Sequence, residues 1–373
     1  MARMLADVIE TKSNNFDLLR LLAALGVMFG HSFWLQPAEG RHEPLLAFTG
    51  LEYSGSLAVY TFFLISGMLV TASYHRQQSW WRFIVLRLAR IYPALFVCVL
   101  VSAFVVYPFI SPRPFWSALA SHAAAHYFLV NAQPWLPTVW GMPDAFMGNA
   151  IKISVNGSLW TLNAELKCYA IVLVGGVLGF FKRPRRAFAY ALLASFAFLL
   201  IWRVGSSNAL FWGFRTKMLG YTLYPAMFFI LGMFLYAVRS KVPVTGSPLV
   251  VLVPIYVFFP HSLLGHILLY GNLVLAILWA AGSRIFIRLV PSADLSYGVY
   301  LWAFPIQQVV AMWFPNGDNY IGLLMSMPLT LCIAAASWFL LEKPILSVVR
   351  RRVKRKSVSV ADENPAAVAG AVA

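Results

Sequence analysis

The chain has 373 residues, of which 60% are hydrophobic and only 11% are charged. Soluble domains carry about 25% charged residues, so this composition excludes an ordinary soluble protein and predicts a multi-pass membrane protein. A net charge of +16 would suggest nucleic-acid binding in a soluble protein. Here the cytoplasmic loops of a membrane protein explain the charge, because such loops collect Lys and Arg, and no nucleic-acid partner is expected.

Apolar segments recur along almost the whole chain. A membrane-spanning helix needs about 20 mostly apolar residues, and the segments have or approach this length. We therefore predict an all-α, multi-pass transmembrane helical bundle of about ten helices. The predicted spans are 17–36, 57–74, 91–110, 158–181, 187–203, 219–237, 248–261, 263–281, 296–314 and 320–341.

The basic residues orient this bundle in the membrane. Most of the 29 Lys and Arg residues precede the first span, follow the last span or lie in alternate loops. Because basic loops stay on the cytoplasmic side, we expect both termini to be cytoplasmic. We divide the chain into a transmembrane domain, residues 1–345, and a cytoplasmic tail, residues 346–373, that is basic at first and disordered at its end.

The first span carries ionisable residues on one helical face. Asp17 and Arg20 lie near its cytoplasmic end, and His31 follows Arg20 by eleven residues. At about 100° and 1.5 Å per residue, this spacing returns to within about 20° of the same face, about 16 Å along the axis. Ionisable groups inside a membrane are costly and normally face a cavity, so we predict a functional polar face. The alternative is a histidine that only hydrogen-bonds to a neighbouring helix.

The fourth span begins with NGSLWTLNAELKCY, residues 156–169. If this helix enters the membrane near Ser158, Glu165 lies about 10 Å deep, close to the depth expected for His31. Glu165 would then orient His31 as a general base. The alternative is a structural ion pair of Glu165 with Lys167 or with an arginine.

The third span is preceded by two arginines, Arg87 and Arg90, which are three residues apart on one helical face. Guanidinium pairs bind phosphate groups. With Arg20 they predict a basic funnel for a polyanion that enters from the cytosol, and the alternative is anchoring to lipid headgroups. His122 and His126 have a spacing compatible with a metal, but no third ligand follows, and no metal site is expected.

In this order and spacing, the motifs resemble those of the membrane-bound acyltransferase-3 family, which includes bacterial O-acetyltransferases of surface polysaccharides. The matching elements are Arg20 with His31, FFLISG at 62–67, Arg87 with Arg90, SLWTLNAE at 158–165, SYGVYL at 296–301 and EKP at 342–344. The chain departs from many members at Ala303, where they have a histidine. His31 is therefore left as the main candidate base.

The resemblance implies an O-acyltransferase of the bacterial cytoplasmic (inner) membrane that moves an acyl group, expected to be acetyl, from acyl-CoA to a hydroxyl of a glycan or glycolipid. Arg20, Arg87 and Arg90 would bind acyl-CoA, and His31 and Glu165 would be catalytic. Acyl-CoA, expected to be acetyl-CoA, is a co-substrate, and no bound cofactor is expected. The other expected partners are the acceptor, membrane lipids and polysaccharide-assembly proteins. Further site candidates are Asp17, Ser66, Trp160, Asn163 and Tyr297.

Two other functions are compatible with the sequence. A proton-coupled transporter or a glycolipid flippase also uses buried His and Glu residues, although the chain shows no repeated halves with matched broken helices. A scaffold subunit of a polysaccharide machine would need none of the predicted site residues. Acyl-CoA turnover and substitution of the paired arginines would distinguish these functions from the enzyme.

Overall fold

A computed structural model describes residues 3–11, 14–77, 79–204 and 223–363 of the chain. The described part is helical, with two isolated β-bridges and no strand. The predicted all-α multi-pass bundle is therefore confirmed. Five stretches of the described residues are long and apolar enough to cross a membrane, and three shorter apolar helices accompany them. The five are Phe16–Leu35, Ser54–Gln77, Trp80–Ile110, Leu263–Gly282 and Asn319–Lys354.

Each predicted span has a helical counterpart within the described residues. These helices are α2 (Phe16–Leu35), α4 (Ser54–Gln77), α5 (Trp80–Val101), α9 (Trp160–Val177), α10 (Pro184–Val204), α11 (Ala226–Ala237), α12 (Ser247–Phe258), α13 (Leu263–Gly282), α14 (Ser296–Trp313) and α15 (Asn319–Ser337). Shorter or peripheral helices are α1 (Leu5–Glu10), α3 (Pro44–Thr49), α6 (Tyr107–Ile110), α7 (Phe115–Leu119), α8 (His122–Asn131) and α16 (Lys343–Glu363). The first four residues of the predicted sixth span, 219–222, lie outside the described residues.

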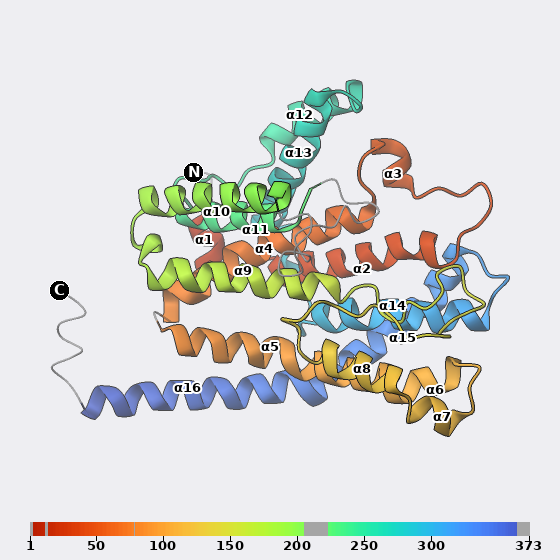
Figure 1. Cartoon of the computed structure of the whole chain (residues 1–373). Coiled ribbons are helices and arrows are strands. Elements are labelled where there is room, and N and C mark those ends of the chain that lie inside the picture. Colours follow the sequence, from red (N-terminus) through yellow and green to blue (C-terminus); the bar gives the residue numbers. More distant parts are fainter. Residues whose placement is uncertain (1–2, 12–13, 78, 205–222, 364–373) are drawn as a thin grey trace.

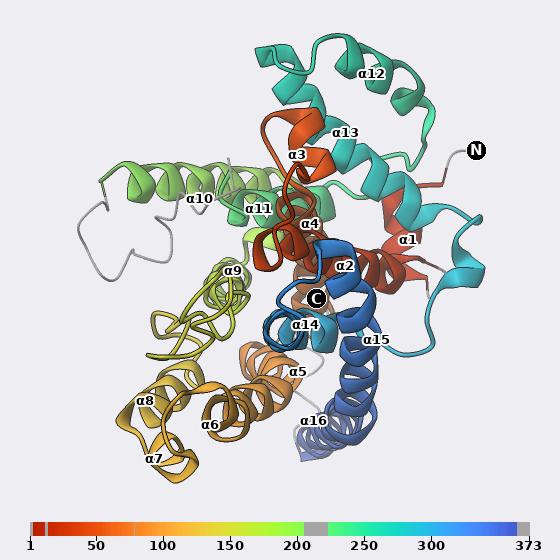
Figure 2. The ribbon, with the colours of Figure 1, turned by 90° about the vertical axis from the view of Figure 1, so that its right-hand side faces the viewer.

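The long helices of the bundle run in roughly one direction (Figure 1) and several are seen almost end-on in the perpendicular view (Figure 2). Helix α14 lies at the centre and packs against α15 and α2, while α4 packs against α2 and α11. Most side chains of α14 are buried, including those of the polar residues Ser296, Gln307 and Gln308. The α12–α13 hairpin projects away from this centre.

Two glycines allow α4 and α11 to touch through their backbones. A Cβ atom on Gly67 would lie 2.1 Å from the carbonyl oxygen of Phe229, and one on Gly232 would lie 2.3 Å from that of Leu64. Any larger residue would therefore force the helices apart. Close approach at small residues is the usual way in which membrane helices gain packing contacts.

The segment between α8 and α9 folds into the bundle instead of lying across its end. Asn156 and Ser158 are only 1% and 2% exposed. The side-chain amide of Asn156 donates to the carbonyl oxygen of Leu301 on α14 at 2.9 Å, and that of Asn149 donates to the carbonyl oxygen of Gln308 at 2.8 Å. Helix α9 therefore begins inside the bundle, and Figure 1 shows its first turn well short of the right-hand end of α2.

Helix α1 and the last turns of α16 lie toward the same side of the bundle, at the left in Figure 1. The stretch Asn319–Lys354 has 36 residues, more than the roughly 20 that a membrane requires, so the basic α16 extends beyond the apolar layer. The predicted domain boundary after residue 345 falls within α16, and residues 346–363 are helical. The predicted disordered end, 364–373, lies outside the described residues.

Candidate functional site

A cavity of about 770 Å³ lies among α2, α4, α5, α9, α14 and α16. It brings together the three arginines predicted to bind phosphate, Arg20, Arg87 and Arg90, and it is also lined by Glu165. Four further cations line the cavity, at the end of α4, at the start of α5 and on α16. These are Arg76, Arg82, Arg350 and Lys354. The arginines predicted to form a basic funnel therefore line one cavity, to which four helices contribute cations, and their role in binding a polyanion stays a prediction.

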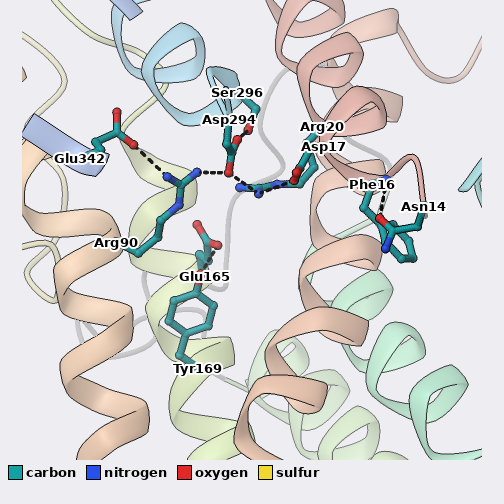
Figure 3. A network of polar contacts seen from close by, with 10 residues as sticks. All are labelled: Asn14, Phe16, Asp17, Arg20, Arg90, Glu165, Tyr169, Asp294, Ser296 and Glu342. Carbon is teal, nitrogen blue, oxygen red and sulfur yellow. Dashed lines mark hydrogen bonds and ion pairs between the residues drawn. The ribbon is translucent and has the colours of Figure 1, made fainter. Parts of the chain in front are cut away.

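Asp294 joins two of these arginines (Figure 3). Its Oδ2 atom lies 2.6 Å from Nη2 of Arg90 and 3.0 Å from Nη1 of Arg20, and its Oδ1 atom accepts a hydrogen bond of 2.7 Å from the Ser296 hydroxyl. Burial by itself would raise the pKa of Asp294. The guanidinium groups of Arg20 and Arg90 outweigh burial and hold this pKa well below its ordinary value.

Two other carboxylates contact the same arginines. Glu342 is fully buried, and its Oε2 atom lies 2.9 Å from Nη1 of Arg90. Asp17 is half exposed and lies 3.9 Å from Arg20, so it adds little. Sequence reasoning missed Asp294 and Glu342 as site residues. The available signals were their positions, because Asp294 precedes the SYGVYL segment by two residues and Glu342 begins the EKP segment.

Arg87 differs from Arg20 and Arg90 because it forms no ion pair with any described carboxylate. Its Nη2 atom lies 3.4 Å from the hydroxyl of Ser73, and its guanidinium lies 5.8 Å from the ring centre of Tyr169. Its Nε atom is buried without a hydrogen-bond partner. A buried donor without a partner is costly, and an anionic ligand would satisfy it without breaking an existing ion pair.

Glu165 lines the same cavity, and Figure 3 shows its carboxylate close to Arg90. Its carboxylate accepts a hydrogen bond from the hydroxyl of Tyr169, one helical turn further along α9. It forms no ion pair with Lys167 or an arginine in the part of the chain that the structure describes. The structural ion pair considered as the alternative is therefore not present in this conformation.

His31 lies apart from this group, and the structure does not bring it into contact with Glu165. It is not among the residues that line the cavity. Its ring contacts Phe304 edge-on, with ring centres 5.3 Å apart, and its Nδ1 atom is buried without a hydrogen-bond partner. The expectation of matching depths is not met, because Glu165 lies close to Arg90 and Asp294 (Figure 3), whereas His31 follows Arg20 by eleven residues on α2. Glu165 therefore lies at the level of the arginines rather than at that of His31, and the catalytic roles of both residues stay predictions.

A layer of three side chains, Phe62, Thr161 and Tyr300, lines the cavity on the side of His31. The hydroxyls of Thr161 and Tyr300 are hydrogen-bonded at 2.6 Å, and the ring of Phe62 packs edge-on against Tyr300 at 5.7 Å. All three line the cavity. Phe304, which touches His31, follows Tyr300 by one turn of α14. Along α14, Tyr300 therefore lies between Tyr297, which contacts Arg90, and Phe304, which contacts His31.

The remaining site candidates divide into two groups. Asp17, Ser66 and Tyr297 line the cavity, and the Tyr297 hydroxyl donates to the carbonyl oxygen of Ile91 at 2.9 Å. Trp160 and Asn163 do not line it, and the Asn163 amide instead donates to the carbonyl oxygens of the α8–α9 segment.

The predicted metal-compatible pair does not extend to a metal site in the described residues. The rings of His122 and His126 stack with centres 5.9 Å apart. No group of three or more His, Cys, Asp or Glu side chains is placed to hold a metal ion within those residues.

Comparison with known proteins gives matches over most of the chain. The family described as Acyltransferase domain matches residues 13–342. The chain is 31% identical over 350 residues to the O-acetyl transferase of Shigella phage Sf6, a match that covers 90% of this chain and 97% of that protein. It is 29% identical over 368 residues to nodulation protein 10 of Rhizobium leguminosarum bv. viciae, covering 92% of this chain and 96% of that protein. No solved structure matches the chain.

Proposed function

Because the chain belongs to the membrane-bound acyltransferase-3 family and is a membrane-embedded acyltransferase, we propose that its donor is a cytosolic acyl-CoA and its acceptor a hydroxyl of a glycan or glycolipid. By similarity to the phage O-acetyl transferase, acetyl is the group that we expect it to transfer. We place the enzyme in the bacterial inner membrane. Membership of the family favours this function over a transporter, a flippase or a scaffold subunit.

The observation that carries the proposal is the basic cavity with its unpaired arginine. Arg87 presents a guanidinium that forms no ion pair with a described carboxylate, beside Arg20 and Arg90. Guanidinium groups form strong, often bidentate hydrogen bonds with phosphates, and acyl-CoA carries several phosphate groups. The volume of about 770 Å³ lies within the range of about 300–1,000 Å³ that is usual for small-molecule sites.

The long pantetheine arm of the donor would extend from the arginines toward His31. Arg20 and His31 are eleven residues apart on one face of α2, about 16 Å along its axis. The layer of Phe62, Thr161 and Tyr300 lies on this route, so transfer in this proposal requires the layer to move aside. His31 would then accept the proton of the acceptor hydroxyl. The hydroxyl oxygen would attack the thioester carbonyl, and the CoA thiolate would leave.

In this proposal Glu165 does not orient His31, the role that its estimated depth in the membrane suggested from the sequence. Its carboxylate is held by Tyr169 within the cavity and does not reach His31. A negative charge at this point would orient the neighbouring guanidiniums rather than meet a phosphate. Glu165 would therefore position the donor site, and it would assist His31 only after the layer between them has moved.

The test uses the purified protein in nanodiscs with radiolabelled acetyl-CoA. We expect turnover by the wild type, and Arg87→Gln should raise the KM for acetyl-CoA by about tenfold or more, because a hydrogen bond to a charged group contributes about 1.5–3 kcal/mol. Arg113→Gln is the matched control, since Arg113 pairs with Asp144 on an exposed loop. Absence of turnover, or an unchanged KM in Arg87→Gln, would contradict the proposal. Mass spectrometry of surface glycans from cells with and without the protein tests the acceptor.

A further inference from the structure

One wall of the cavity comes from a helix that lies beyond the residues matched by the family. The match ends at residue 342, and α16 begins at Lys343. Four of its residues nevertheless line the cavity: Leu346, Arg350, Val353 and Lys354. They are spaced at i, i+4, i+7 and i+8, which places them on one helical face. This face of α16 is therefore part of the site.

Packing fixes this face against the rest of the bundle. Leu346 and Val353 are only 5% and 8% exposed, whereas Arg350 and Lys354 are exposed at the cavity wall. Helix α16 packs along α5. The two apolar side chains therefore act as anchors, and the position of the two cations is set by the fold rather than by a flexible tail.

The cations of α16 belong to a second basic group, separate from the arginines around Asp294. We call Arg76, Arg82, Arg350 and Lys354 the outer cation cluster. Its members come from the end of α4, the start of α5 and α16. Arg76, Arg82 and Arg350 form no ion pair in the part of the chain that the structure describes, and Nε of Arg82 is buried without a hydrogen-bond partner.

The two basic groups differ in how much of their charge is neutralised. Arg20 and Arg90 share Asp294, and Arg90 also contacts Glu342. Among the described residues that line the cavity, the only acidic ones are Asp17, Glu165 and Asp294. None of these three forms an ion pair with Arg76, Arg82 or Arg350. Arg76, Arg82 and Arg350 therefore differ from Arg20 and Arg90, because no described carboxylate forms an ion pair with them.

A donor with two separate anionic groups fits this division. Coenzyme A carries a diphosphate and, on its ribose, a 3′-phosphate. We propose that the outer cation cluster, with Arg350 and Lys354 of α16, is the subsite for this 3′-phosphate, while Arg87 binds the diphosphate. The inference rests on the proposed acyl-CoA donor and adds to it a wall and a phosphate subsite. A phosphate monoester has a charge of about −1.5 to −2 at pH 7, which suits a group of several cations.

The experiment compares acetyl-CoA with acetyl-dephospho-CoA, which lacks the 3′-phosphate. The variant is Arg350→Gln/Lys354→Gln, and the matched control is Arg351→Gln/Arg352→Gln, which removes the same charge from exposed residues of α16 outside the cavity. All proteins are assayed in nanodiscs of neutral lipid. We expect the variant to raise the KM for acetyl-CoA about tenfold with little change in kcat. Its KM for acetyl-dephospho-CoA should equal that of the wild type, and the control should behave as the wild type with both donors.

Lipid headgroups offer the same phosphate chemistry, so a second arm repeats the assay in nanodiscs that contain anionic lipid. An effect of the variant that occurs only with anionic lipid assigns the cluster to lipid and overturns the inference. The inference is also overturned if the wild type uses both donors equally well, or if the variant raises the KM for both donors to the same extent. If the variant turns over and prefers acetyl-CoA to acetyl-dephospho-CoA as strongly as the wild type does, the subsite is rejected but the proposed donor is not. If the wild type uses neither donor, the proposed donor itself fails, and the inference fails with it.

Discussion

Asp294 is a single carboxylate that serves two guanidinium groups through one oxygen atom. The side chains of Arg20, Arg90 and Asp294 are only 20%, 14% and 15% exposed. Such a cluster costs desolvation energy to form, but removal of one partner is costly too, because the remaining charges stay buried without compensation. Asp294 therefore fixes the relative positions of α2 and α5 at the base of the cavity.

The first prediction concerns the loss of this carboxylate. Asp294→Asn should lower the free energy of unfolding by ~3 kcal/mol, because it leaves Arg20 and Arg90 with weaker partners in a buried site. Thermal unfolding of the purified protein in detergent measures the change. Asp318→Asn is the control, since Asp318 pairs with Arg41 on an exposed surface, where ion pairs contribute little. Equal effects of the two substitutions would show that the Asp294 contacts are not stabilising.

The second prediction follows from the pKa of the same residue. Its pKa in the folded protein is lower than in the unfolded chain, so ionised Asp294 stabilises the fold at pH values above the unfolded pKa of about 3.9. This contribution is lost as the pH falls through the lower, folded pKa. The stability difference between wild type and Asp294→Asn should therefore stay constant from about pH 8 to pH 5 and narrow only in stronger acid. Urea titrations in detergent at a series of pH values measure it, and a difference that disappears near pH 6 would contradict the assignment.

At the scale of helices, the contact of α4 with α11 depends on two positions without side chains. The third prediction is that Gly67→Ala lowers the free energy of unfolding by about 1–3 kcal/mol, because the new methyl group meets the backbone of Phe229, which cannot rotate away. The matched control is Gly271→Ala in α13, where a Cβ atom meets nothing within 4 Å. Its stability should be unchanged or slightly higher, since alanine favours helix. Thermal unfolding distinguishes the two, and equal values would refute a backbone contact at Gly67.

The helices could be predicted from the sequence because their signal is local. Each span is a run of apolar residues of a length that the bilayer sets, and the spacing of Arg87 and Arg90 is local in the same sense. The start of α9 could not be predicted in this way. Polar residues such as Asn156 can be buried there because Asn156 donates a hydrogen bond to the carbonyl oxygen of Leu301, 145 positions away. The hydropathy of a segment does not reveal so distant a partner.

The same limit applies to the candidate site. The sequence indicated Arg20, Arg87 and Arg90 by charge within apolar surroundings, and the structure brings them to one cavity. Asp294 lies in a loop, where a carboxylate is ordinary, and only the fold reveals that it bridges two helices. The separation of His31 from Glu165 likewise depends on how far the α8–α9 segment enters the bundle, which no spacing along one helix determines.

At the scale of the whole molecule, the two ends of the bundle differ in charge. The outer cation cluster and the basic α16 lie at one end, and His31 lies beyond the opposite end of the cavity on α2. This polarity fits a donor that enters from one side and an acceptor that approaches from the other. It requires that the end carrying α1 and α16 face the cytosol, as the distribution of Lys and Arg predicts.

The last prediction tests this orientation with an impermeant maleimide. Cys332, the exposed native cysteine, is first replaced by alanine, while Cys98 and Cys168 are buried and stay in place. A cysteine at the exposed position of Glu39, between α2 and α3, should react in right-side-out membrane vesicles. A cysteine at the exposed position of Arg284, after α13, should react only in inverted vesicles, because the membrane separates the two positions. Labelling in the reverse pattern would place the basic mouth outside the cell and exclude a cytosolic donor, and labelling of both from one side would refute the arrangement of spans between them.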